Sequence, residues 1–256
     1  MYKIFTNTLF LGKEVVYLPS CHSTNDIASD LLARNRPEGT VVITDRQTAG
    51  RGQRGNQWNA VPGENLTFSI VFRPKFLAIS EAFGLNLFVS LALRDWAASY
   101  VAPQAEVKWP NDLYVGGKKM GGVLIENTLK GKQLQGSVIG IGVNINQMVF
   151  EGLRATSLRL LTGEVLELRS SLEKLLLCLE RRYLQLKRQN WSGLWAEYHE
   201  FLLGRGQVRE FTTEAGVFSG KILGVNKQGY LELMMPDGST EAFPHGSISW
   251  VFEDPD

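Results

Sequence analysis

The sequence predicts an α+β protein: a larger unit with helices around a mixed, mostly antiparallel sheet, then a small SH3-like β-barrel. Helical patterns stand among paired strand patterns instead of alternating regularly with single strands. Two long strand patterns, over 118–129 and 133–146, are joined by a Lys-Gly turn, as in an antiparallel hairpin. After Gly204 only short strand-like segments remain. The predicted boundary therefore separates residues 1–203 from residues 204–256.

Strand and helix patterns succeed one another at the start of the chain. Residues 13–18 predict a strand, and Ser23 or Thr24 can cap the helix that follows. Pro37 ends that helix. The β-branched run 40–44 then predicts a short buried strand, which leads directly into a glycine-rich loop.

Longer patterns complete the larger unit and distinguish it from the barrel. Residues 65–72 alternate as in a half-buried strand, and residues 81–100 carry apolar side chains at helical spacing. Two more helices are expected at about 170–188 and 191–202. Turn signals separate the expected barrel strands, which are 207–212, 217–225, 229–234, 240–243 and 248–252.

Composition excludes several functional classes. The chain has 256 residues, 44% of them hydrophobic and 21% charged, as in an ordinary globular protein. Its net charge of +1 gives no support to general nucleic-acid binding. No stretch is long and apolar enough to cross a membrane, and the N-terminus lacks the features of a signal peptide. A cytoplasmic location is therefore expected.

The two cysteines, Cys21 and Cys178, are far apart and form no CxxC motif. Neither a zinc site nor a disulfide framework is indicated. Cys178 lies in a leucine-rich run and fits a core position. Cys21 stands next to His22, so a nucleophilic Cys–His pair remains open as an alternative.

Residues 50–58 read Gly-Arg-Gly-Gln-Arg-Gly-Asn-Gln-Trp. Glycines let a backbone fold closely over a ligand, and guanidinium groups between them suit an anion. The segment is not a Walker A loop, because no Gly-Lys-Ser/Thr closes it. It is not a dinucleotide fingerprint either, because no apolar helix follows. A solvated hairpin tip is the alternative interpretation.

A second stretch, residues 108–112, reads Lys-Trp-Pro-Asn-Asp and is followed by Lys119 and paired glycines. Together with the glycine loop it points to activation of a carboxylate by a nucleotide. Two like charges about 4 Å apart repel by ~4 kcal/mol at an effective dielectric near 20, so fixed cations are needed. Arg51, Arg54 and Lys119 supply them, and Asp112 can help to hold Mg²⁺. The alternatives are a structural Asx turn at the Asn-Asp pair and a solvated lysine.

Five segments taken together resemble the motif set of biotin protein ligases, in that family's order and spacing. They are 23–25 (Ser-Thr-Asn), 45–55, 108–112, 119–122 and 139–146. The resemblance covers nearly the whole chain and implies a catalytic fold like that of class II aminoacyl-tRNA synthetases. It implies that biotin and ATP give biotinyl-5′-AMP and pyrophosphate. Biotin then passes to one lysine of a biotin carboxyl carrier protein or domain of a biotin-dependent carboxylase.

The resemblance also implies which residues bind and react. The implied biotin-binding residues are Ser23, Thr24, Asn25, Gln47, Gly50, Arg51, Gly52, Gln53, Trp58, Lys119 and Gly122. The implied nucleotide-binding residues are Arg51, Arg54, Trp58, Asn111, Lys119, Gly140, Gly142 and Asn144. Catalysis is assigned to Lys119, Arg51 and Asp112, and Asp112 is also the expected magnesium ligand. From the residues alone, Ser23 and Thr24 could be a helix cap and Trp58 a core side chain.

Two features depart from the family pattern. Gln53 stands where many members carry arginine, which predicts looser retention of the adenylate unless Arg54 compensates. The Ser-Thr-Asn motif begins only 22 residues into the chain, which leaves no room for the N-terminal helix-turn-helix domain of repressor relatives. No DNA partner and no membrane partner are therefore expected. A homodimer is compatible with the resemblance.

Two other functions compete with the biotin ligase. A lipoate–protein ligase or octanoyltransferase shares the general fold but uses an Arg-Arg…Gly-Gly-Gly pattern that is not found here. A noncatalytic biotin sensor would not need Arg51, Lys119 and Asp112, because the head of biotin is uncharged. The ligase hypothesis requires the cations of Arg51 and Lys119 to converge in the folded chain.

Overall fold

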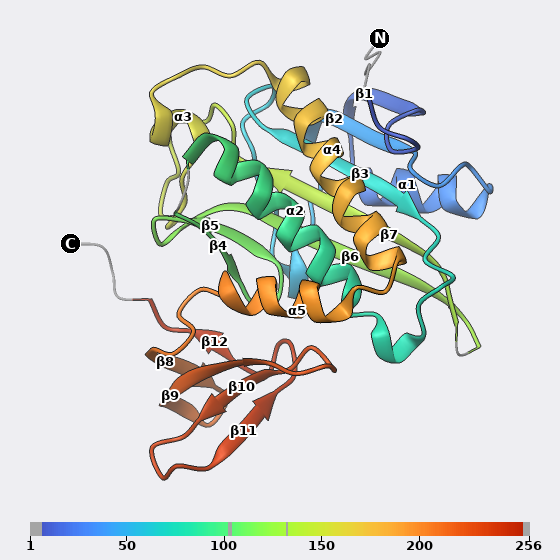
Figure 1. Cartoon of the computed structure of the whole chain (residues 1–256). Coiled ribbons are helices and arrows are strands. Elements are labelled where there is room, and N and C mark those ends of the chain that lie inside the picture. The colour runs from blue at the N-terminus through green and yellow to red at the C-terminus, as the bar shows by residue number, and fades with distance from the viewer. Residues whose placement is uncertain (1–6, 102–103, 132, 253–256) are drawn as a thin grey trace.

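The computed structural model describes residues 7–101, 104–131 and 133–252, apart from the side chain of Arg54. Its main feature is a seven-stranded sheet of order β1-β2-β3-β7-β6-β5-β4 (Figure 1). Only β1 and β2 pair in parallel, and the other neighbours are antiparallel, which confirms the predicted mixed sheet. In that order the strands are Val15–Cys21, Val41–Gln47, Leu66–Phe72, Gln133–Val143, Lys118–Lys130, Asp112–Val115 and Ala105–Lys108.

Helices cover both faces of this sheet. Alternate strand residues point to opposite faces, so Val42 packs with Ala28 of α1 while its neighbours Val41 and Ile43 enter the larger core beneath α2 and α4 (Figure 1). The helices are α1 (Thr24–Ala33), α2 (Gly84–Val101), α3 (Leu158–Thr162), α4 (Leu168–Lys187) and α5 (Trp191–Glu200), with short 3₁₀ turns η1 (Gln53–Gly55) and η2 (Ile79–Glu81).

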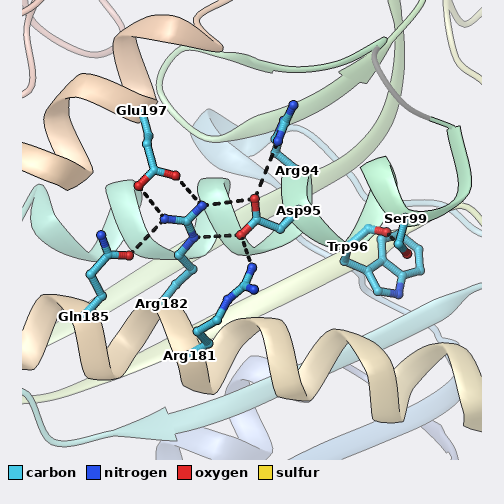
Figure 2. A network of polar contacts seen from close by, with 8 residues as sticks. All are labelled: Arg94, Asp95, Trp96, Ser99, Arg181, Arg182, Gln185 and Glu197. Atoms are coloured by element: carbon cyan, nitrogen blue, oxygen red, sulfur yellow. Dashed lines mark hydrogen bonds and ion pairs between the residues drawn. The ribbon is translucent and has the colours of Figure 1, made fainter.

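A buried ion network joins α2, α4 and α5 (Figure 2). The Arg182 side chain is 8% exposed, and its Nε lies 2.7 Å from Oδ2 of Asp95. On its other side the same guanidinium donates to both carboxylate oxygens of Glu197. Arg181, which is far more exposed, also pairs with Asp95. The helical layer thus neutralises the charge that it buries.

The C-terminal part is a separate five-stranded antiparallel sheet of order β11-β10-β9-β8-β12 (Figure 1). Its core is built from side chains such as Phe211, Ile222 and Leu233. This sheet agrees with the predicted fold class, while the limits 1–203 and 204–256 stay a prediction. Its strands are β8 (Val208–Thr213), β9 (Gly216–Val225), β10 (Leu231–Met234), β11 (Thr240–Phe243) and β12 (Ser249–Trp250).

The strands β4 and β5 are absent from the predicted elements. Each has four residues, too short for an alternating pattern to stand out. They form a hairpin whose turn is Trp109-Pro110-Asn111, with a cis bond before Pro110. Asn111 lies on the turn, as expected, but Asp112 already belongs to β5. The hairpin places the Lys-Trp-Pro-Asn-Asp motif at the end of the sheet that faces the small domain.

Candidate active site

A cavity of about 310 Å³ lies between the large sheet, the glycine-rich loop and the C-terminal sheet. One end is uncharged and polar. There the Oε1 atom of Gln47 accepts from the backbone N–H of Thr24 at 2.7 Å, and Ser69 donates to Thr24 Oγ1 at 2.7 Å and to Asn25 Oδ1 at 2.6 Å. Ser23 stands at the helix N-cap, but its side chain makes no capping hydrogen bond and lines the cavity. These fixed donors and acceptors suit a ligand with amide-like groups.

The glycine-rich loop is a small hairpin folded over the cavity. Trp58 N–H donates to Gly50 at 3.1 Å, Gly52 N–H donates to Asn56 at 2.7 Å, and Arg51 bridges to Gln57. The hairpin alternative was therefore right about its shape. The hairpin nevertheless borders the cavity, because Arg51 and Gly52 line it.

Arg51 reaches from this hairpin to two carboxylates. Its Nη1 lies 2.7 Å from Asp26 of α1, and its Nη2 lies 3.2 Å from Glu126 of β6. The hydrogen bond that Arg51 donates to Asp26, with the nearby charge of Glu126, raises the pKa of Arg51. Asn25 also donates to Glu126, at 2.7 Å. The guanidinium therefore sits at the cavity with its charge intact.

Lys119 of β6 also lines the cavity. Its Nζ lies 2.7 Å from Oδ2 of Asp112 in β5, and both side chains line the cavity. Gly122 leaves room for this pair, because a Cβ there would stand 3.3 Å from both Asp112 Oδ1 and Lys119 Nζ. Arg51 and Lys119 line one cavity, so the requirement that these cations converge is met.

Two glycines of β7 make room for side chains of the chain itself. A Cβ on Gly140 would collide with the amide of Asn25, and a Cβ on Gly142 would collide with the indole of Trp58. The Nε1 atom of Trp58 is buried without a hydrogen-bond partner. Gly140, Gly142 and Trp58 all line the cavity, and the nucleotide-binding role expected of them stays a prediction.

Three residues assigned from the sequence do not line the cavity. Gly50 is buried at the base of the hairpin, where a Cβ would strike the carbonyl of Trp58. Asn111 is 1% exposed and accepts from Gln53 Nε2 at 3.1 Å. Asn144 is buried and donates to the Thr156 carbonyl at 3.0 Å. Their placement follows from main-chain packing, which a motif does not reveal. The predicted role of Arg54 falls on a side chain outside the described part.

The C-terminal sheet supplies a wall of the cavity that the sequence did not predict. Its segment 245–252 contributes the lining residues His245, Gly246, Ile248, Ser249, Trp250 and Phe252. Trp109 fixes this sheet next to the motif, because its Nε1 donates to Gly229 at 2.9 Å and its ring lies against His245. No pattern in the last residues signals this, because the contact joins parts of the chain about 120 residues apart.

The Cys21–His22 alternative loses its support. Burial raises the pKa of the Cys21 thiol, so the nucleophilic thiolate is disfavoured. His22 contacts Thr48, with Nδ1 2.9 Å from the threonine hydroxyl. Neither Cys21 nor His22 lines the cavity.

Two features are absent from the residues that the structure describes. No group of three or more His, Cys, Asp or Glu side chains is arranged to hold a metal ion. Within the same ranges, no helix combines the length and apolar character needed to cross a bilayer.

Comparison with known proteins identifies relatives of the chain. Residues 17–144 match the sequence model of the biotin/lipoate A/B protein ligase family. The bifunctional ligase/repressor BirA of Bacillus subtilis is 31% identical over 236 residues, covering 90% of this chain and 72% of that protein. The biotin–[acetyl-CoA-carboxylase] ligase of Mycobacterium tuberculosis is 33% identical over 183 residues, covering 68% of this chain and 66% of its own length.

Solved structures agree with these sequence relatives. The biotin protein ligase of Aquifex aeolicus, in complex with biotin and ATP, superposes with a TM-score of 0.79 at 27% identity. The match covers 94% of this chain and 100% of the Aquifex chain. The similarity therefore includes both the large sheet and the C-terminal sheet.

Proposed function

The chain belongs to the biotin/lipoate A/B protein ligase family, and we propose that it acts as an ATP-dependent biotin protein ligase. It joins biotin to AMP with release of pyrophosphate, and it then transfers biotin to a lysine of a carrier domain. The observation that carries this conclusion is the single cavity with an uncharged polar end beside Thr24 and Gln47 and a cationic centre at Arg51 and Lys119. That division matches a ligand with a neutral urea head and an acidic tail.

We assign the polar end to the head of biotin. Ser23, Thr24, Asn25 and Gln47 line it. The hydrogen bonds between Thr24 and Gln47 and from Ser69 to Asn25 hold ligand-facing groups in place before binding. Trp58 supplies an apolar surface between this end and the centre. The head therefore binds in a preformed site.

We assign the centre to the reacting groups. A carboxylate oxygen of biotin attacks the α-phosphorus of ATP, and the bond from that phosphorus to the bridging oxygen breaks as pyrophosphate leaves. Lys119 stabilises the negative charge that gathers on the α-phosphoryl oxygens. Asp112 holds the ammonium of Lys119 in position at 2.7 Å.

Arg51 must exchange partners to take part. Its two ion pairs are about 40–49% exposed on the carboxylate side, and such pairs are worth ~0–1 kcal/mol each. An anionic ligand in the cavity can therefore draw the guanidinium away from Asp26 or Glu126 at little cost. Closure of the hairpin with Arg51 then shields the mixed anhydride from water.

We propose that Asp112 would hold a Mg²⁺ ion delivered with the triphosphate. The donor set fits, since Mg²⁺ commonly binds one or two carboxylates together with substrate phosphates, and Asp112 is the carboxylate that lines the cavity. When bound, the ion neutralises charge on the leaving phosphates. The chain's own contribution is to orient Asp112 through Lys119.

The acceptor is proposed from the chemistry and from the relatives. Relatives from Paracoccus denitrificans and Mycobacterium tuberculosis bear the name biotin–[acetyl-CoA-carboxylase] ligase. We propose a biotin carboxyl carrier domain as the acceptor here. The amine of its lysine attacks the acyl carbon of biotinyl-5′-AMP, and AMP leaves with the phosphate oxygen.

The test is a reconstituted reaction. Purified chain is mixed with biotin and MgATP, biotinyl-5′-AMP is detected by mass spectrometry, and a carrier domain is then added. We expect adenylate formation with biotin and none with lipoate or octanoate. Binding of biotin without pyrophosphate release would instead identify a sensor, and adenylation of lipoate would identify the other branch of the family.

A further inference from the structure

Lys108 is a partly buried cation that lines the cavity and that the adenylation step described for Arg51 and Lys119 does not use. It lies at the end of β4, and its side chain lines the same cavity as Lys119. The Nζ atom stands 5.4 Å from the ring of Trp250 and 5.8 Å from those of Tyr114 and Phe252. Two of these rings come from the C-terminal part of the chain, so the cage exists only when the two domains are together.

The cage holds the ammonium without neutralising it. Aromatic faces attract a cation, but they supply no hydrogen bonds and no negative charge. Among the side-chain hydrogen bonds and ion pairs of the described residues, none involves the Lys108 ammonium, which is near the aromatic rings. Burial lowers the pKa of Lys108, Asp112 opposes that shift, and Lys119 reinforces it. A buried cation that opens on a cavity in this way favours an anion from the ligand.

The order of the strands indicates which anion Lys108 binds. Gln47 ends β2, Lys119 lies on β6, and Lys108 lies on β4, two strands beyond β6 in the same direction. Adjacent strands are ~4.8 Å apart, so the backbone of Lys108 is roughly 10 Å further from the polar end than that of Lys119, and Lys108 lies one strand beyond Asp112, the partner of Lys119. In phosphoryl transfer the attacking and leaving oxygens are roughly in line. A carboxylate that arrives from the β2 side therefore expels its leaving group toward β4.

We propose that Lys108, held by the rings of Tyr114, Trp250 and Phe252, binds the pyrophosphate group as it leaves. The proposal rests on the function proposed above and adds a site for one product. It also gives the C-terminal sheet a part in the adenylation step, through Trp250 and Phe252. Binding of the biotin carboxylate by Lys108 is the competing interpretation.

The experiment measures the reverse reaction, in which pyrophosphate and biotinyl-5′-AMP regenerate ATP and biotin. Lys108→Met should raise the KM for pyrophosphate at least tenfold and weaken pyrophosphate binding in calorimetry to a similar degree. The dissociation constant of biotin and the rate of transfer from preformed biotinyl-5′-AMP should stay within twofold. Lys118→Met, which removes an exposed lysine of β6, is the matched control and should leave every value within twofold.

Two further variants distinguish loss of the cation from general damage to the cavity. Lys108→Arg keeps a cation that can stack on the rings, so it should recover most of the pyrophosphate affinity. Trp250→Leu opens the cage and should raise the KM for pyrophosphate about threefold. An unchanged KM for pyrophosphate in Lys108→Met, or an equal loss of biotin affinity, would overturn the proposal. Failure of the unmodified protein to make biotinyl-5′-AMP would instead refute the proposed function itself.

Discussion

Basic side chains have different surroundings in the helical layer and in the cavity. In the helical layer, Arg182 is flanked by the carboxylates of Asp95 and Glu197 (Figure 2). The described side chains that line the cavity include three basic groups, Arg51, Lys108 and Lys119, and one carboxylate, Asp112.

This difference in surroundings distinguishes charges that stabilise the fold from charges that can bind a ligand. A buried cation whose hydrogen bonds are taken by carboxylates of the same protein holds elements together and is not available to bind a ligand. In the cavity the ion pairs of Arg51 and Lys119 are partly exposed, and the described residues give the Lys108 ammonium aromatic rings but no carboxylate partner, so an anionic substrate can complete the site. Substitutions in the helical layer should therefore lower the stability of the fold, whereas substitutions in the cavity should lower activity and leave stability nearly unchanged.

The largest effect on stability is expected from Arg182→Met. It leaves Asp95 and Glu197 without their shared buried partner, and breaking a buried pair costs about 3–5 kcal/mol. Denaturant unfolding measures the loss. Arg181→Met is the control, because Arg181 pairs with the same Asp95 but is 65% exposed, and it should cost less than ~1 kcal/mol. Equal losses in the two variants would refute the contrast.

The same network predicts a pH dependence. Arg182 holds the pKa of Glu197 below its usual value of 4.5. That contribution to stability is complete above the unfolded pKa and is lost as pH falls through the lower folded value. Arg182→Met should therefore flatten the loss of stability on acidification.

Lys119→Ala should have the largest effect on chemistry. It removes the cation at the α-phosphoryl group, and loss of one such group costs about 10²–10³ in kcat. Pyrophosphate release from biotin and ATP measures it. The free energy of unfolding should change by less than ~1 kcal/mol, because the pair with Asp112 is partly exposed. A rate near that of the unmodified protein would contradict the assignment.

Arg51→Gly should raise leakage of biotinyl-5′-AMP about tenfold. The guanidinium closes the hairpin over the adenylate and no other atom of residue 51 can replace it. Rapid filtration of the preformed complex gives the release rate. Arg36→Gly removes an arginine from a surface pair with Glu14 and should leave release unchanged.

Gln53→Arg is expected to have the smallest effect, a release about threefold slower. Gln53 already ties the hairpin to Asn111 and to the Val123 carbonyl through its amide, so arginine adds charge more than it adds order. Gln133→Arg, on the exposed hairpin between β6 and β7, controls for charge alone. If both variants release the adenylate at the unmodified rate, position 53 does not determine retention.

Elements were predictable from the sequence where the pattern of apolar residues extended over many neighbouring positions. The long helices and the β6–β7 hairpin were predictable, because apolar spacing over ten or more residues reflects one local geometry. The short strands β4 and β5 were missed, because their four-residue patterns carry little information. Gly140 and Gly142 were expected to bind the nucleotide, which stays a prediction, but no local pattern shows that the groups packed against them are Asn25 and Trp58, over 80 residues away.

By itself the sequence determined the chemistry: a glycine hairpin with arginine, a lysine near paired glycines, and a polar turn before a helix. These are properties of neighbours along the chain. Only the tertiary structure decided which charges are neutralised, that Trp250 closes around Lys108, and that Asn144 faces the interior. Such outcomes depend on contacts between distant segments, whose geometry is set when the sheet and the C-terminal domain pack together and not by any local pattern.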